Sequence, residues 1–190
     1  DGFPVDFDIS EDGKKMVTSY MCVKKGVQEN YLSFYNFDEV GQNSINRLVG
    51  ARSFKEIMIP KVSFLNNDIV CAMQKDGFSL YEMKQIPSDI GQIACEGEIR
   101  SLMCGDSYIG VMLEDFEKTT KKKLVIYDLN GKPVLEKEDD FQYEGIYLSG
   151  EEIVFYGNFS WEIMRFNGSI KYSGEFEQEI EYVFPVDNFD

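Results

Sequence analysis

The chain has 190 residues, of which 43% are hydrophobic and 14% aromatic, so we expect a buried core and no general disorder. Its net charge of -15 opposes binding to nucleic acid, because affinity for phosphates comes from lysine and arginine. The chain contains no histidine, which excludes within it a Ser-His-Asp triad, a Cys-His dyad and any imidazole-ligated metal site.

Four similar stretches recur along the chain and predict its architecture. They begin at Leu32 (LSFYNFDEVG), Phe78 (FSLYEMKQIPSD), Leu124 (LVIYDLNGK) and Trp161 (WEIMRFNGSI). Aligning them places one position of each in register, at steps of 46, 46 and 37 residues: Tyr35, Tyr81, Tyr127 and Met164. This spacing is typical of β-propeller blades, each of which is a meander of four antiparallel strands.

In chain order, each unit begins with an entering strand, a turn and a second apolar strand. The entering strands are expected at 5–10, 61–66, 99–104 and 145–149, and the second strands at 14–23, 68–73, 107–113 and 151–157. The repeated stretch supplies the third strand, and more polar segments such as 132–138 and 169–176 supply the outer strand. Residues 36–54 are interpreted as the longest irregular connection.

The predicted fold is therefore all-β, a propeller-like array of about four four-stranded antiparallel blades plus the start of a fifth. The units are placed at 5–60, 61–98, 99–142 and 143–179, with a partial unit at 180–190, in a single propeller-like domain. A two-sheet β-sandwich is the alternative fold. The last segment either closes a small ring on the first blade, or the chain is a fragment of a longer propeller. In the second case exposed end blades would favour a homodimer.

Several of these runs resemble an uncharacterised family of clostridial-type Gram-positive proteins. The resemblance is carried by DISEDGKKMVTSY, FYNFDEVGQN, IPKVSF, EIRSL with YIGVML, and YDLNGK. It implies a parent protein with a short cytoplasmic tail, one membrane helix and an outward-facing propeller-like domain of unknown function. This chain would be the later part of that extracellular domain, on the outer face of a bacterial cell membrane and attached only through an anchor that it lacks. The family supplies no catalytic residues.

The segment from Asp8 to Gly13 (DISEDG) is spaced like the opening of a calcium loop. The bidentate carboxylate that such a loop needs at its twelfth position is replaced here by Ser19, so we interpret the segment as a hairpin turn. No metal or other cofactor is predicted. The cysteines match no zinc or redox spacing and are interpreted as structural residues: Cys22, Cys71, Cys95 and Cys104. Cys22, Cys71 and Cys104 lie in apolar runs and are expected to be buried.

Two charged segments are interpreted as solvent-exposed. Alternate glutamates, Glu175 to Glu181, would share one face of an outer strand, where like charges discourage aggregation. Lys121, Lys122 and Lys123 are assigned to a loop.

Contact with a ligand is expected at the 36–54 connection, because loops of a propeller form its broad faces. The named candidates are Asn43, Arg47 and Arg52. Trp161, the only tryptophan, is a further candidate, although its alignment with Leu32 and Leu124 also fits a place in the core.

The first functional hypothesis is a non-catalytic module that binds a surface protein or a cell-wall polymer. The second is a carboxylate-dependent, carbohydrate-active enzyme, whose polar groups would come from the entering strands and gather at the axis: Asp6, Asp8, Lys61, Arg100 and Glu144. The third is a structural spacer. Acidic side chains that converge in a pocket would favour the enzyme hypothesis. A flat aromatic patch would favour the binding module, and a uniformly charged surface would favour the spacer.

Overall fold

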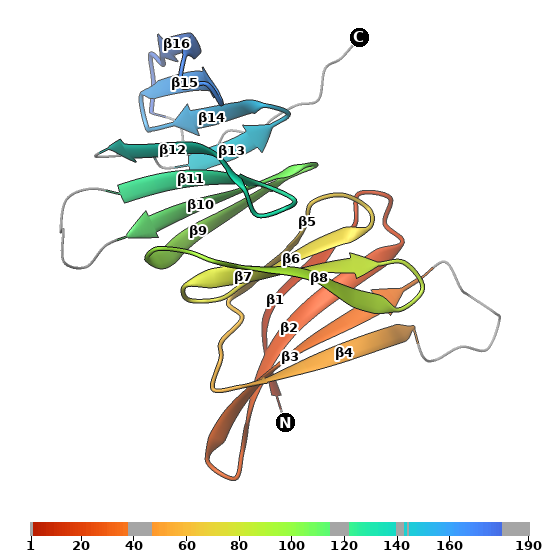
Figure 1. Cartoon of the computed structure of the whole chain (residues 1–190). Helices are drawn as coiled ribbons and strands as arrows, with labels where there is room; N and C mark the ends of the chain where they lie inside the picture. The colour runs from red at the N-terminus through yellow and green to blue at the C-terminus, as the bar shows by residue number, and fades with distance from the viewer. Residues whose placement is uncertain (1, 38–46, 115–121, 140–142, 144, 180–190) are drawn as a thin grey trace. The chain divides into compact units, whose positions relative to one another are not determined.

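The computed structural model describes residues 2–37, 47–114, 122–139, 143 and 145–179. These residues form four four-stranded antiparallel sheets, each made of four consecutive strands in chain order (Figure 1). The all-β, propeller-like prediction is thus confirmed, with four sheets in place of the two that a sandwich would have. The described part of the chain contains no helix long and apolar enough to cross a membrane.

The first sheet consists of β1 (Gly2–Ile9), β2 (Lys15–Lys24), β3 (Val27–Asn36) and β4 (Leu48–Lys55). The second consists of β5 (Lys61–Phe64), β6 (Ile69–Met73), β7 (Gly77–Met83) and β8 (Pro87–Ala94). The third consists of β9 (Glu98–Gly105), β10 (Tyr108–Glu114), β11 (Lys122–Asp128) and β12 (Pro133–Asp139). The fourth consists of β13 (Gly145–Ser149), β14 (Glu152–Tyr156), β15 (Ser160–Arg165) and β16 (Ile170–Glu175).

The same irregularity recurs in every sheet, between its third and fourth strands. The pairing register shifts by one residue at Phe34/Tyr35, Leu80/Tyr81, Ile126/Tyr127 and Ile163/Met164. These are the positions that the sequence repeat aligns. A bulge re-aims the strand and increases its twist, so the four stretches are equivalent in structure as well as in sequence.

The chain divides into two compact units, Asp1–Leu102 and Met103–Asp190. In the first unit the core lies between the first and second sheets and comprises Val17, Leu32, Phe34, Ile59, Val62, Val70, Ala72, Tyr81 and Met83. In the second unit the core comprises Met103, Met112, Leu124, Ile126, Ile153, Phe155 and Met164. The predicted blade boundaries and the single domain stay predictions.

Three expectations about local structure are wrong. The second half of the supposed irregular connection 36–54 forms β4, which pairs with β3 through most of its length. Lys122 and Lys123 begin β11 and pair with the outer strand, while Lys121 lies outside the described residues. The strand expected to carry alternate glutamates ends at Glu175, so Glu177 and Glu179 do not continue its face, and Glu181 lies outside the described residues.

Candidate functional site

Two carboxylates named for the enzyme hypothesis, Asp6 and Asp8, join neighbouring sheets. In β1, Oδ2 of Asp6 accepts a hydrogen bond from the backbone N–H of Val62 at 2.9 Å. Oδ2 of Asp8 accepts one from the N–H of Phe64 at 2.7 Å and one from the hydroxyl of Ser63 at 3.1 Å. Both carboxylates therefore satisfy donors of β5, the first strand of the second sheet.

The connection between β4 and β5 presents two apolar side chains to solvent. Ile57 is 42% exposed and Met58 is 48% exposed, whereas the next residue, Ile59, is fully buried in the core. The connection begins with a backbone reversal at Glu56, whose φ of 59° lies in the left-handed region that few non-glycine residues adopt. In this short segment Ile59 is buried in the core, and Ile57 and Met58 point into solvent.

A buried polar network holds this segment in place. The side-chain carbonyl of Asn30 accepts a hydrogen bond from the N–H of Ile59 at 3.2 Å, and the hydroxyl of Ser19 donates to the carbonyl of Ile59 at 2.7 Å. The Asn30 amide also donates to the Ser19 hydroxyl at 2.8 Å, and both side chains are fully buried. Buried polar groups that are satisfied in this way fix one geometry, so Ile57 and Met58 project from a rigid support.

A hollow of about 610 Å³ lies beside these two residues, and we call it the loop-end hollow. Its lining comes from the β4–β5 connection, the end of β6 with the β6–β7 turn, and the beginning of β9: Glu56, Ile57, Met58, Pro60, Met73, Gln74, Lys75, Asp76, Glu98, Ile99 and Arg100. Because consecutive strands of the second sheet are antiparallel, these three segments meet at one end of that sheet.

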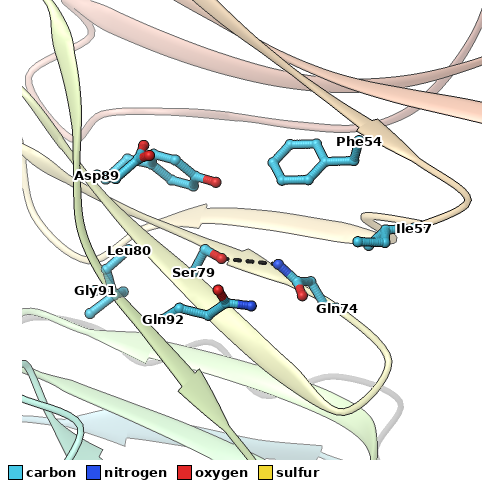
Figure 2. Close-up of a pocket in the computed structure, with 9 residues that line it drawn as sticks. Phe54, Ile57, Gln74, Ser79, Leu80, Asp89, Gly91 and Gln92 are labelled. Carbon is cyan, nitrogen blue, oxygen red and sulfur yellow. Dashed lines mark hydrogen bonds between the residues drawn. The ribbon is translucent and has the colours of Figure 1, made fainter.

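A second hollow of about 430 Å³, the amide pocket, shares Ile57 and Gln74 with the first. Its other residues come from β4, β7 and β8: Phe54, Ser79, Leu80, Tyr81, Asp89, Gly91 and Gln92. Figure 2 shows the Gln74 amide directed at the Ser79 hydroxyl, to which it donates at 2.9 Å, with Gln92 beside them. Amides, a hydroxyl and the ring of Phe54 together can bind peptide or sugar groups.

Charged residues that line the two hollows form ion pairs. In the amide pocket, Asp89 pairs with Arg52, whose Nε lies 3.3 Å from Oδ1. In the loop-end hollow, Glu98 pairs with Arg100 at 3.2 Å and with Lys75 at 3.6 Å. Burial raises the pKa of the Tyr81 hydroxyl above its usual value, so Tyr81 is a neutral hydrogen-bonding group at physiological pH.

The predicted contact residues make separate local contacts. Arg52 lies in β4, where its guanidinium also donates to the Pro87 carbonyl at 2.9 Å and so links the first two sheets. The Arg47 guanidinium lies 5.1 Å from the centre of the Phe37 ring. Asn43 lies outside the described residues. Trp161, in the second unit, is half-buried with its indole across Gly174.

The segment DISEDG forms the predicted hairpin turn. The Ser10 hydroxyl donates to Oδ1 of Asp12 at 2.7 Å, the same oxygen accepts from the N–H of Lys14, and Gly13 has a φ of 70°. Ser19, at the position where a calcium loop needs a carboxylate, is buried in the network described above. The four cysteines form no disulfide; Cys22 and Cys71 are buried as expected, whereas Cys104, which was also expected to be buried, is only half-buried.

Of the proposed axial groups, Lys61 begins β5 and is exposed, and Arg100 carries the ion pair with Glu98. Glu144 lies outside the described residues. Sequence reasoning missed Ile57 and Met58. The available signal was a run of three apolar residues, Ile57 to Ile59, between charged residues and a proline, in a connection that no strand pattern required.

Solved structures with the same fold are longer than this chain. The chain matches Hsv2 of Kluyveromyces lactis with a TM-score of 0.55 and 10% identity, covering 87% of this chain and 46% of that one. It matches the Pan2 WD40 domain of Neurospora crassa with a TM-score of 0.53 and 14% identity, over 92% of this chain and 50% of that one. The chain thus spans about half of these structures, and identities this low show the fold alone.

A third similar structure is the β-propeller domain of the Trilobed protease from Pyrococcus furiosus. The TM-score is 0.57 at 13% identity, and the match covers 94% of this chain and 58% of that domain. That domain is described as having an open velcro topology. No curated protein matches the sequence. The model of a family of unknown function (DUF5711) matches residues 1–190, and this chain therefore belongs to that family.

Proposed function

We propose that this chain is a non-catalytic binding module, which holds a surface protein or a cell-envelope polymer on the outside of a bacterial cell. The observation that carries the proposal is the pair Ile57 and Met58, held outward by a buried network beside two adjoining hollows. An apolar surface with a few polar groups around it is the usual composition of a binding site. The extracellular position rests only on the family resemblance of the sequence.

The contacts of the acidic residues support binding over catalysis. Propeller glycosidases need a pair of carboxylates that meet the substrate. Here Asp6 and Asp8 accept hydrogen bonds from backbone donors of β5, and Glu98 forms ion pairs with the side chains of a lysine and an arginine. These groups serve packing between sheets and the shape of the hollow.

The test is a thermal-unfolding screen of the purified chain with wall sugars, muropeptides, anionic wall polymers and calcium. A ligand at about 100 times its Kd adds about 2.7 kcal/mol to the free energy of unfolding, which is a visible rise in Tm. We expect a rise with one polymer or peptide class and no rise in the variant Ile57→Ser/Met58→Ser. Because both side chains are already exposed, this variant should unfold at nearly the wild-type temperature without ligand.

The matched control is Ile86→Ser in the β7–β8 turn, which replaces a side chain that is 74% exposed and lies outside both hollows. It should bind as the wild type does. A rise in Tm that persists unchanged in Ile57→Ser/Met58→Ser would place the binding site elsewhere and contradict the assignment of binding to the two hollows at Ile57 and Met58. If no ligand raises the Tm, the partner to test next is a protein, and the same variants serve for that test.

A further inference from the structure

The repeat makes individual residues of different sheets directly comparable. One row of paired residues crosses the first three strands of a sheet and ends at the aligned position of the third strand. In the first, second and fourth sheets this row is Ile9–Met16–Tyr35, Phe64–Val70–Tyr81 and Leu148–Ile153–Met164.

In the second and fourth sheets this row is covered by the preceding sheet of the same unit. Tyr81 is 4% exposed, and its ring lies 5.3 Å from that of Phe34 in the first sheet. Met164 is fully buried in one core with Leu124 and Ile126 of the third sheet. The row therefore marks the face of a sheet that receives the sheet before it.

In the first sheet the same face is partly open to solvent, with Met16 and Tyr35 half-buried. Ile9 is 47% exposed, Phe7 on the same side of β1 is 64% exposed, and Leu48, which pairs with Tyr35, is 47% exposed. Asp6 and Asp8 point to the other side of β1, toward the second sheet. We call this surface the leading face: Phe7, Ile9, Met16, Tyr35 and Leu48.

The fourth sheet shows the complementary situation on its opposite side. Trp161 aligns with Leu32 of the first sheet, and Ile163 aligns with Phe34. Leu32 and Phe34 are fully buried in the core under the second sheet, whereas Trp161 and Ile163 are only half-buried. Tyr172, which pairs with Ile163, is 58% exposed. We call this surface the trailing face: Val154, Trp161, Ile163 and Tyr172.

We propose that the leading face of one copy of this chain binds the trailing face of a second copy, so that two chains associate head to tail. Equivalent faces already pack in this order inside each unit, the first sheet on the second and the third on the fourth. The chain spans half of the Pan2 WD40 domain, so two copies supply as much sheet as that domain contains. This inference is independent of binding at the loop-end hollow and the amide pocket.

The contact joins apolar faces of molecules that each carry a net charge of -15. Long-range repulsion between the copies is screened by salt, while burial of apolar surface is not weakened by it. The association should therefore become tighter as ionic strength rises. Contacts that depend mainly on ion pairs would show the opposite dependence on salt.

The experiment measures molar mass by light scattering and by sedimentation over a range of protein and salt concentrations. We expect a dimer that dissociates on dilution for the wild type, and a monomer for Phe7→Asp and for Tyr172→Asp, because a charge in an apolar contact is costly. A mixture of the two variants should regain dimers, because the first retains an intact trailing face and the second an intact leading face. The control Ile86→Asp, on a turn outside both faces, should dimerise as the wild type does.

Circular dichroism and Tm establish that each variant is folded, since all three replaced side chains are exposed. A wild type that stays monomeric at every concentration would overturn the proposal. So would a dimer that Tyr172→Asp leaves intact, which would indicate two leading faces in contact. The proposal would also be overturned if the wild type were a monomer and both Phe7→Asp and Tyr172→Asp unfolded at a lower Tm than it does. That result would show that the two faces are covered within one chain.

Discussion

Replacing Asp8 with alanine tests whether carboxylates of β1 hold the first two sheets together. The Asp8 side chain accepts hydrogen bonds from the Phe64 N–H at 2.7 Å and from the Ser63 hydroxyl at 3.1 Å. Phe64 belongs to β5 and is half-buried against the core of the first unit. Asp8→Ala therefore removes the acceptor of a backbone donor that water reaches only in part.

The expected loss of stability follows from these bonds. A hydrogen bond to a charged group contributes about 1.5–3 kcal/mol, and a neutral one about 0.5–1.5 kcal/mol. We expect Asp8→Ala to lower the free energy of unfolding by about 2 kcal/mol, because the bond to the serine hydroxyl is longer and can be replaced by water. For a chain of this length that loss corresponds to a fall in Tm of about 4–8 °C.

The assay is urea unfolding followed by far-UV circular dichroism, with two companion variants. Asp8→Asn keeps an acceptor without the charge and should recover about half of the loss. Glu11→Ala removes an exposed acid from the adjacent turn, and so controls for the relief of repulsion in a chain of charge -15. If Asp8→Ala unfolds at the same urea concentration as Glu11→Ala, the two sheets do not depend on this carboxylate and the reasoning is refuted.

Two further predictions concern single aromatic residues. Gly174→Ala would place a methyl group 2.8 Å from Nε1 of Trp161, so the indole must move outward and its emission should shift to longer wavelength; an unchanged spectrum would contradict the packing described. Burial raises the pKa of Tyr81, so the stability it contributes is complete below the unfolded pKa of about 10 and is lost as the pH rises through the folded pKa. Tyr81→Phe should lessen the alkaline fall in unfolding free energy, and equal slopes for both proteins above about pH 10 would refute this.

The sequence was sufficient to predict the repeated core, and the outer strand of the first sheet shows where it failed. Apolar alternation and turn residues recur at the spacing of propeller blades. The structure places the same β-bulge next to each aligned residue, from Tyr35 to Met164, so the repeated sequence corresponds to a repeated structure. β4 reads as a loop in the sequence because Gly50 interrupts its apolar residues and three of its last four residues are polar: Arg52, Ser53 and Lys55. That glycine is required by packing, since a Cβ there would lie 2.5 Å from Cγ of Pro87.

The loop-end hollow could not be predicted because its parts come together only in the folded sheet. The β4–β5 connection, the β6–β7 turn and the start of β9 are separated in sequence, and antiparallel pairing brings them to one end of the second sheet. The roles of the charged candidate residues could not be predicted for a related reason. The sequence makes Arg52 a candidate ligand contact, yet its guanidinium binds Asp89 and the Pro87 carbonyl of the second sheet. Which partner a long side chain finds depends on strand pairing between sheets.

The equivalence of the sheets also separates what the fold requires from what it does not. Residues at repeated positions, such as Tyr81 and Met164, are buried and are explained by packing alone. Single exposed apolar residues are common on protein surfaces and need no explanation. Ile57 and Met58 differ because two fully buried polar side chains, Ser19 and Asn30, fix the backbone of the residue that follows them. A spacer would gain nothing from holding apolar side chains rigidly in water, whereas a binding surface gains affinity because less conformational freedom is lost when its ligand arrives.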